Sequence, residues 1–335
     1  MLTHDPANRR PSPWKRRLGS AALVTGAMAI AGCDGDPTTP HGSPSDASLA
    51  TSQGLAAGNS NVVEVVATSL HFDAPDLVPG GWTTFRFRNE TGGTHFVILE
   101  KMPVFDGEQK TLEDSQAEVV PVFQNFMDLF AGVPLSFPAA GLALPAWYPG
   151  VVFMGGPGLI APRGTAETTV FLEPGTYVME CYVKTDGVFH SVDGMIDQIV
   201  VTDEPSRARE PRSTLRVTVS TTDGIEVEGE LRPGRHTIAV HFADQTAYSH
   251  FLGHDIHLAR IDNDTDLDAL AAWMNWSVPG ELETPAPAAF LGGVQDMPAG
   301  STAYFDVLLK PGRYAFIAEV PGPAAGGMLQ TVTVP

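Results

Sequence analysis

The sequence predicts a mostly β protein built from two tandem domains of the same plan. Runs of alternating apolar and polar residues, such as Trp82 to Glu90, are typical of half-buried strands. The 335 residues include 34 Gly and 28 Pro, which favours many turns over long helices. The second half also repeats the first, because residues 292–314 match residues 155–177 without a gap.

The N-terminal part predicts export and lipid anchoring. Basic residues at 15–17 precede an apolar run that ends in Ile30-Ala31-Gly32-Cys33, which resembles a bacterial lipobox. In such signals the cysteine carries the lipid, so residues 1–32 are expected to be a signal peptide and Cys33 the anchor. An ordinary secretory signal that ends near a cysteine is the alternative. We expect an extracytoplasmic protein attached to a bacterial membrane through lipid alone, on the periplasmic or cell-surface side.

Residues 33–61 are small and polar, and they predict a flexible tether. The chain after residue 32 holds 15 basic and 38 acidic side chains. Such a surface repels nucleic acid and suits a basic partner. We therefore exclude nucleic-acid partners and leave open a redox partner protein of unknown identity.

The first domain is expected over residues 62–202. Thr111 to Asp114 resembles a capping box, which predicts a helix running to about Leu129 with a kink or break at Pro121. Pro79-Gly80-Gly81 predicts a turn between two strands. The expected strands, in order, cover residues 62–72, 82–90, 95–102, 167–173, 177–181 and 196–203, with a long Pro- and Gly-rich loop over residues 133–161.

Residues 203–212 are polar and charged, and they predict a linker to a second domain over residues 213–335. This domain repeats the first one and includes a shorter helix from Thr265 to Trp276. The repeat places Ala318 opposite Cys181, and it supplies no histidine in the following loop. The second domain is therefore expected to keep the scaffold and to lack the site described next.

Cys181, His190 and Met195 follow a predicted strand with the spacing Cys-x8-His-x4-Met, and His95 begins an earlier strand. A thiolate, two imidazoles and a thioether are the ligands that copper prefers. If Cys33 carries lipid, Cys181 has no disulfide partner in the chain, which leaves burial, reactivity or metal binding. Each residue alone could be a core side chain, but together they predict one copper ion.

These residues resemble the pattern of the cupredoxins, or blue copper proteins. The resemblance rests on Asn89, His95, the turn Pro174-Gly175-Thr176-Tyr177, and the loop with Cys181, His190 and Met195. It covers most of residues 62–202 and, in degenerate form, residues 213–335. It implies two tandem Greek-key β-sandwich domains, here each with a helical insertion, and one type 1 copper with Met195 as its axial ligand. The Cys181–His190 spacing is similar to that of the type 1 site of copper nitrite reductases.

The resemblance implies single-electron transfer as the function. Copper nitrite reductases and multicopper oxidases place a His directly before the Cys, as a link to a catalytic copper, whereas Glu180 stands there in this chain. This difference favours electron transfer over catalysis. Three alternatives stay open: a copper delivery or sensing module without redox traffic, a metal-free scaffold, and an oxidoreductase with a second metal at His250, His254 and His257.

Overall fold

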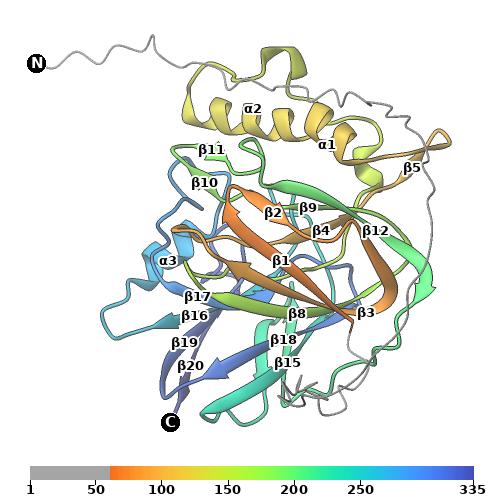
Figure 1. The fold of residues 1–335 in the computed structure, drawn as a ribbon. Helices are drawn as coiled ribbons and strands as arrows, with labels where there is room; N and C mark the ends of the chain where they lie inside the picture. Colours follow the sequence, from red (N-terminus) through yellow and green to blue (C-terminus); the bar gives the residue numbers. More distant parts are fainter. Residues whose placement is uncertain (1–60) are drawn as a thin grey trace, which may run out of the picture. The chain divides into compact units, whose positions relative to one another are not determined.

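The computed structural model describes residues 61–335 (Figure 1). The predicted signal peptide, Cys33 and nearly all of the predicted tether lie outside the described residues. Strands dominate the described part, so the predicted mostly β architecture with helical insertions is confirmed. Within residues 61–335, no helix combines the length and the apolar character that crossing a bilayer requires.

The first β unit is built around one long strand, β3 (Leu77–Asn89), that takes part in two layers. Its first residues pair in parallel with β12, and the rest pairs with β1 and β8. On the other side of β12 follow β9, β4 and β7. The unit contains β1 (Val62–Ser69), β2 (His71–Asp73), β4 (Ile98–Lys101), β7 (Val152–Phe153), β8 (Thr165–Leu172), β9 (Gly175–Glu180) and β12 (Ile196–Pro205), and the small hairpins β5 (Val104–Phe105) with β6 (Glu108–Gln109) and β10 (Lys184–Thr185) with β11 (Val188–Phe189).

The turn predicted at Pro79-Gly80-Gly81 is wrong, because β3 runs through these residues without reversing. They mark the point where β3 leaves β12 and joins β8. Gly81 has φ +105°, and a Cβ on Gly80 would lie 3.1 Å from the Thr202 carbonyl oxygen. The two glycines therefore let one strand bend from one sheet into the other, as strands do at sandwich corners.

The helical insertion of the first unit is a pair, α1 (Leu112–Glu118) and α2 (Val120–Ala131). The predicted capping box is present, since the Thr111 N–H donates to Asp114 Oδ2 at 2.9 Å. The break falls at Val119, directly before the Val120-Pro121 start of α2, where the proline takes a first-turn position that needs no donor. Short 3₁₀ helices at Pro138–Ala140 and Tyr148–Gly150 follow in the long loop.

The second β unit repeats the first in structure as well as in sequence. Tyr177 and Tyr314, 137 residues apart, each donate a hydroxyl hydrogen bond of 2.8 Å to the carbonyl four residues upstream. Gly156 and Gly293 show the same correspondence, with φ +120° and +152°. The unit contains β13 (Leu215–Ser220), β14 (Gly224–Glu228), β15 (Gly234–Phe242), β16 (Ile256–Ile261), α3 (Leu267–Trp273), β17 (Ala289–Val294), β18 (Thr302–Leu309), β19 (Gly312–Ile317) and β20 (Leu329–Val334).

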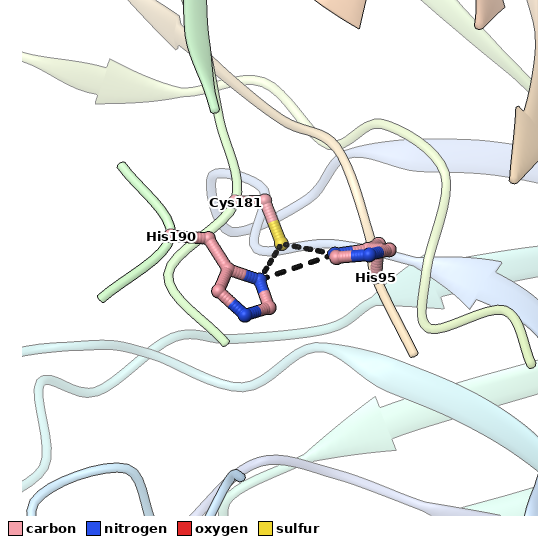
Figure 2. Close-up of side chains that lie close together, drawn as sticks. All are labelled: His95, Cys181 and His190. Atoms are coloured by element: carbon pink, nitrogen blue, oxygen red, sulfur yellow. Dashed lines mark hydrogen bonds between the residues drawn. The ribbon is translucent and has the colours of Figure 1, made fainter. Parts of the chain in front are cut away.

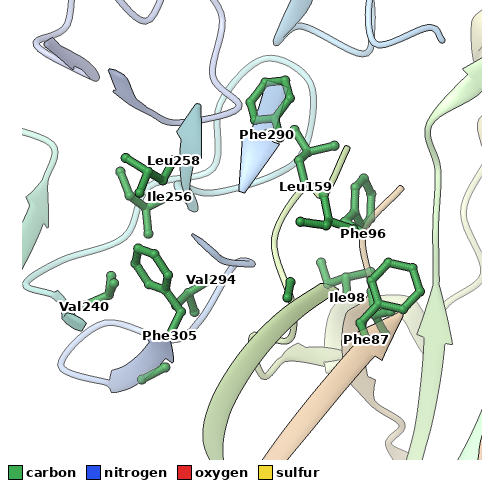
Figure 3. Close-up of a cluster of buried hydrophobic side chains, with 14 of the residues drawn as sticks. Phe87, Phe96, Ile98, Leu159, Val240, Ile256, Leu258, Phe290, Val294 and Phe305 are labelled. Carbon is green, nitrogen blue, oxygen red and sulfur yellow. The ribbon is translucent and has the colours of Figure 1, made fainter. Parts of the chain in front are cut away.

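The two units share one sheet and one core. Strand β8 of the first unit pairs antiparallel with β18 of the second, so the sheet continues from one unit to the other. Figure 3 shows the buried side chains of both units, among them Phe96 and Leu159 from the first and Phe290 and Phe305 from the second. The contact is thus an apolar interior rather than a loose linker contact. The predicted boundaries at residues 202 and 213 stay predictions.

Candidate metal centre

Three separate segments bring His95, Cys181 and His190 to one point (Figure 2). His95 lies between β3 and β4 and forms an isolated antiparallel bridge with Ile160. Cys181 directly follows β9, and His190 directly follows β11. Because β4 and β9 are antiparallel and pair Ile98 with Glu180, the segments that carry His95 and Cys181 meet at the same end of the sheet. This pairing explains how two residues 86 positions apart share a site.

The three donor atoms form a triangle of metal-binding size. The Cys181 Sγ lies 3.7 Å from His95 Nδ1 and 3.8 Å from His190 Nδ1, and the two Nδ1 atoms are 3.1 Å apart. The point equidistant from these three atoms lies about 2.1 Å from each, close to the metal–nitrogen and metal–sulfur bond lengths of protein sites. The donors therefore lie close enough together to bind one transition-metal ion.

Threonine hydroxyls fix the outward nitrogen of both rings. His95 Nε2 lies 2.8 Å from Thr91 Oγ1, and His190 Nε2 lies 2.9 Å from Thr185 Oγ1. With Nε2–H donating to the hydroxyl oxygen, each neutral ring keeps the Nδ1 lone pair free on the side of Cys181. Metal-ligating histidines are held in this way, with one nitrogen for the metal and the other for a fixed acceptor.

Burial keeps the three donors uncharged when no cation is present. It lowers the pKa of His95 to about 4 and, helped by the neighbouring His95, the pKa of His190 to about 3. Burial also raises the pKa of the Cys181 thiol to about 12. The two imidazoles are thus ready to bind a metal at neutral pH, whereas the thiol has to lose its proton first.

Met195 closes the ligand loop through its backbone. Its N–H donates to the His190 carbonyl at 2.8 Å, and its carbonyl accepts from the Cys181 N–H at 3.1 Å. Its side chain is fully buried. The structure thereby places Met195 next to both loop ligands, while its role as axial ligand stays a prediction.

Both units hold the loop between Cys181 and His190. From α2, the Gln124 amide nitrogen donates to the Gly187 carbonyl, and its oxygen accepts from the Phe189 N–H at 3.1 Å. From the second unit, Glu283 Oε1 accepts from the Gly187 N–H at 2.8 Å. The buried Lys184 ammonium donates to the Trp276 carbonyl at 2.7 Å. These contacts fix the ligand loop before any metal binds.

No protein-family model matches the sequence, and no curated protein matches it. Among solved structures, the chain is similar to a dithionite-reduced auracyanin of Roseiflexus castenholzii, with 24% identity, 43% of this chain and 99% of that chain covered, and a TM-score of 0.25. Auracyanin A of Chloroflexus aurantiacus, a "blue" copper protein, is 23% identical, with 42% of this chain and 98% of that chain covered and a TM-score of 0.26. A copper nitrite reductase of Nitrosomonas europaea is 12% identical, with 82% of this chain and 93% of that chain covered and a TM-score of 0.21.

The matches include blue copper and copper nitrite reductase structures.

The structure does not bring His250, His254 and His257 together as a ligand set. His250 Nε2 hydrogen bonds the Glu319 carbonyl at 2.9 Å, and its ring stacks on Trp276. His254 Nε2 lies 3.0 Å from the Asp244 carbonyl oxygen, and its Nδ1 lies 3.2 Å from the Tyr248 hydroxyl. All three rings are buried, but their nitrogens face different partners.

His257 instead lies in a buried cluster with Asp255 and Glu319, which the sequence reasoning missed. The β16–β19 register pairs His257 with Ile317, so Asp255 stands opposite Glu319 if the ladder is extended by two residues. Asp255 Oδ1 accepts from the Glu319 N–H at 2.6 Å. The repeat could have revealed the cluster, because Glu319 occupies the position of Tyr182 in the first unit.

The hydrogen bonds of His257 indicate a structural role rather than metal binding. Its Nδ1 accepts from the Leu159 N–H at 3.0 Å, so the neutral ring carries its proton on Nε2, which faces Asp255 Oδ2 at 2.6 Å. A metal-bound histidine would need a lone pair on one nitrogen and an acceptor for the other. Here Nδ1 faces a donor, so His257 joins the two units through hydrogen bonds.

Glu180, which precedes Cys181, points to the opposite face of β9 because successive strand residues alternate. It lies on the same face as Glu100 of the paired strand β4, and the two share a cavity lined also by Tyr148 and Trp276. Burial raises the pKa of both carboxyls, and for Glu100 the nearby Glu180 adds to the shift. The residue next to Cys181 thus belongs to an acid pair in which Glu100 is buried and Glu180 is half-buried.

Proposed function

We propose that this protein binds one copper ion through His95, Cys181 and His190, with Met195 as axial ligand, and that it transfers single electrons. We also propose that residues 1–32 are removed on export and that lipid on Cys33 tethers the protein to a bacterial membrane. The observation that carries the copper site is the donor triangle, with both Nδ1 atoms facing the Cys181 sulfur and both Nε2 atoms held by threonines.

The donor set favours copper over zinc. Structural zinc sites hold four strong ligands in a tetrahedron of Cys, His or carboxylate. Here two imidazoles and one thiol come together, and the residue that closes the ligand loop is Met195, whose thioether suits copper in a weak axial position. Bound copper supplies one-electron chemistry by alternating between Cu(I) and Cu(II).

The protein's own contribution is rigidity and exclusion of water. The loop from Cys181 to His190 is fastened by Gln124, Lys184 and Glu283, and the donor atoms are buried. A preformed ligand set changes little between the two oxidation states of the ion, so the cost of rearrangement during electron transfer is small. Such a site suits repeated one-electron cycling.

Copper titration of the mature protein tests this function. Addition of Cu(II) is expected to produce an intense absorption band at about 600 nm, typical of His2Cys-Met ligation, at one copper per chain. Folded, reduced protein that takes up no copper, or that binds it without this band, would contradict the proposal. Tight Cu(I) binding with sluggish redox cycling would instead favour copper delivery, and two coppers per chain would favour an oxidoreductase.

A further inference from the structure

The ligand histidines do not reach the protein surface. His95 is 2% exposed and His190 is 1% exposed, because α2 and residues of the second unit cover the ligand loop. Figure 1 shows α2 next to β10 and β11, the hairpin that leads to His190. An electron that enters or leaves the proposed copper site therefore has to cross a layer of side chains.

A chain of aromatic contacts crosses this layer. Phe189, the neighbour of His190, packs against Trp276 with ring centroids 5.6 Å apart. Trp276 contacts Phe123 at 5.8 Å, and Phe123 contacts Phe126 at 6.1 Å. From Phe126 the contacts continue to two further rings, Phe251 at 5.5 Å and Phe130 at 6.4 Å, both stacked on it. The ligand loop is thus connected to the outer side of α2 by packed rings.

The outer end of this chain is an exposed aromatic patch formed by Phe126, Phe130 and Phe251. Phe130 is 45% exposed and Phe251 is 46% exposed. Leu129, next to Phe130, is exposed as well. Contiguous exposed apolar groups of this kind mark interaction sites more often than scattered single ones.

Phe251 supplies a second, independent observation. Its backbone has φ +74°, in the left-handed region that bulky residues rarely adopt. A turn holds it there, with the Phe251 N–H donating to the Tyr248 carbonyl at 3.0 Å. The second unit thus holds Phe251 in a strained backbone conformation that places its ring beside α2. Such strain is typical of functional positions.

The charge around the patch defines the partner. The sequence has no Lys or Arg between Lys110 and Arg163, which includes all of α2, and none between Arg235 and Arg260, which includes Phe251. Asp186, at the tip of the β10–β11 hairpin that Gln124 contacts, is exposed. Lys184 contacts Met127 of α2, but its ammonium is buried and does not reach the surface. An apolar patch on two segments that carry no Lys or Arg, within an acidic chain, is complementary to an apolar surface ringed by Lys and Arg. It is less suited to an anionic membrane.

We propose that the aromatic patch is the docking face for a redox protein whose apolar contact surface is ringed by basic residues. On docking, the copper that His95, Cys181 and His190 would hold would supply one electron to the partner's redox centre, or accept one from it, through the same face. This inference rests on the proposed function, because it needs copper at Cys181. It adds the surface and the chemistry of the partner.

Stopped-flow electron exchange between the Cu(I)-loaded protein and an oxidised basic c-type cytochrome tests the docking face. The double variant Phe130→Gln, Phe251→Asn is expected to react about tenfold more slowly than the wild type, since apolar anchors dominate interface energies. Asn is chosen because it tolerates the left-handed backbone. Leu77→Ser and Leu308→Ser, at apolar residues 65% and 60% exposed elsewhere, are the matched controls and are expected to react at the wild-type rate.

An acidic c-type cytochrome and added salt test the charge complementarity. The basic cytochrome is expected to react faster than the acidic one, and its rate is expected to fall as salt is added. Asp186→Asn is expected to weaken this salt dependence while leaving the copper absorption band in place. Equal rates for both cytochromes, or a rate independent of salt, would overturn the proposed partner chemistry.

The outcomes separate this inference from the function on which it rests. A wild type that takes up no copper, or that does not exchange electrons even with ferricyanide, contradicts the proposed function. A wild type that exchanges electrons while the patch variant, with an intact band and unchanged thermal stability, reacts equally fast overturns the docking face. Patch-dependent binding to zwitterionic lipid vesicles, with unchanged electron exchange, would assign the patch to a membrane and also overturn it.

Discussion

His95 and His190 direct their Nδ1 atoms toward each other across 3.1 Å, and burial keeps both rings neutral at pH 7. Two lone pairs at this distance repel each other unless a cation lies between them. The Thr91 hydroxyl donates to Asn89 Oδ1, so it accepts from His95 Nε2 and leaves a lone pair on His95 Nδ1. The Thr185 hydroxyl can accept from His190 Nε2 or donate to it. Binding of a metal ion through both Nδ1 atoms therefore requires the His190 tautomer in which Nε2 donates to Thr185.

The Thr185 hydroxyl is predicted to contribute to copper affinity through the His190 ring. Thr185→Val removes the acceptor of the Nε2 proton and is expected to weaken copper binding by about 10- to 100-fold. Competition with a chelator of known affinity measures the change. Thr185→Ser keeps the hydroxyl and serves as the control, and equal affinities for the Val and Ser variants would show that the hydroxyl does not matter.

Copper binding is predicted to release about one proton per ion at neutral pH. The folded thiol of Cys181 has a pKa of about 12, so at pH 7 it is protonated and must lose its proton to become a ligand. The imidazoles, with pKa values of about 4 and 3, are already neutral and release none. Affinity should fall about tenfold per pH unit as the pH is lowered toward 4, and more steeply below it.

Calorimetric titration in buffers of different ionisation enthalpy measures this proton release. Release of no proton would mean that Cys181 is a thiolate before copper arrives, or that it is not a ligand. Release of two or more would mean that a histidine is protonated in the apo protein.

Cys181→Ala is predicted to abolish the absorption band while leaving the fold of the apo protein intact. The second unit carries Ala318 at the corresponding position, fully buried in the same scaffold, so the scaffold tolerates alanine there. The lost sulfur should cost about 1–2 kcal/mol of unfolding free energy. Denaturant unfolding of the apo proteins checks this value, and a variant that fails to fold would show a structural need for the sulfur.

Lys184→Met is predicted to destabilise the protein by about 2–4 kcal/mol, because it leaves the Trp276 and Val278 carbonyls without their buried donor. Met keeps most of the side-chain volume, so packing changes little. Lys101→Met, which breaks an ion pair with the exposed Glu173, is the control and should cost less than about 1 kcal/mol. If thermal unfolding shows a similar loss of stability for both variants, Lys184 has no special role in holding the ligand loop.

Several elements could be predicted from local sequence because their causes are local. The capping box at Thr111 begins α1 as expected, and the strands alternate as their side chains indicate. The ligand order Cys-x8-His-x4-Met lies on one short loop, so the closeness of Cys181, His190 and Met195 follows from chain length alone. The prediction of a turn at Pro79-Gly80-Gly81 was wrong because the same residues also allow a strand to change sheets. Whether the strand does so depends on its partners β12 and β8.

Hydrophobic periodicity, turn residues and ligand chemistry are properties of neighbouring residues, so the fold class, the internal repeat and the candidate donor residues could be predicted from the sequence. Only the tertiary structure decided which nitrogen of each histidine faces Cys181, because that depends on threonines brought into place by folding. It also decided that His257 joins Asp255 and Glu319 rather than His250 and His254. Strand register and contacts between the two units set these partners, and no local pattern encodes them.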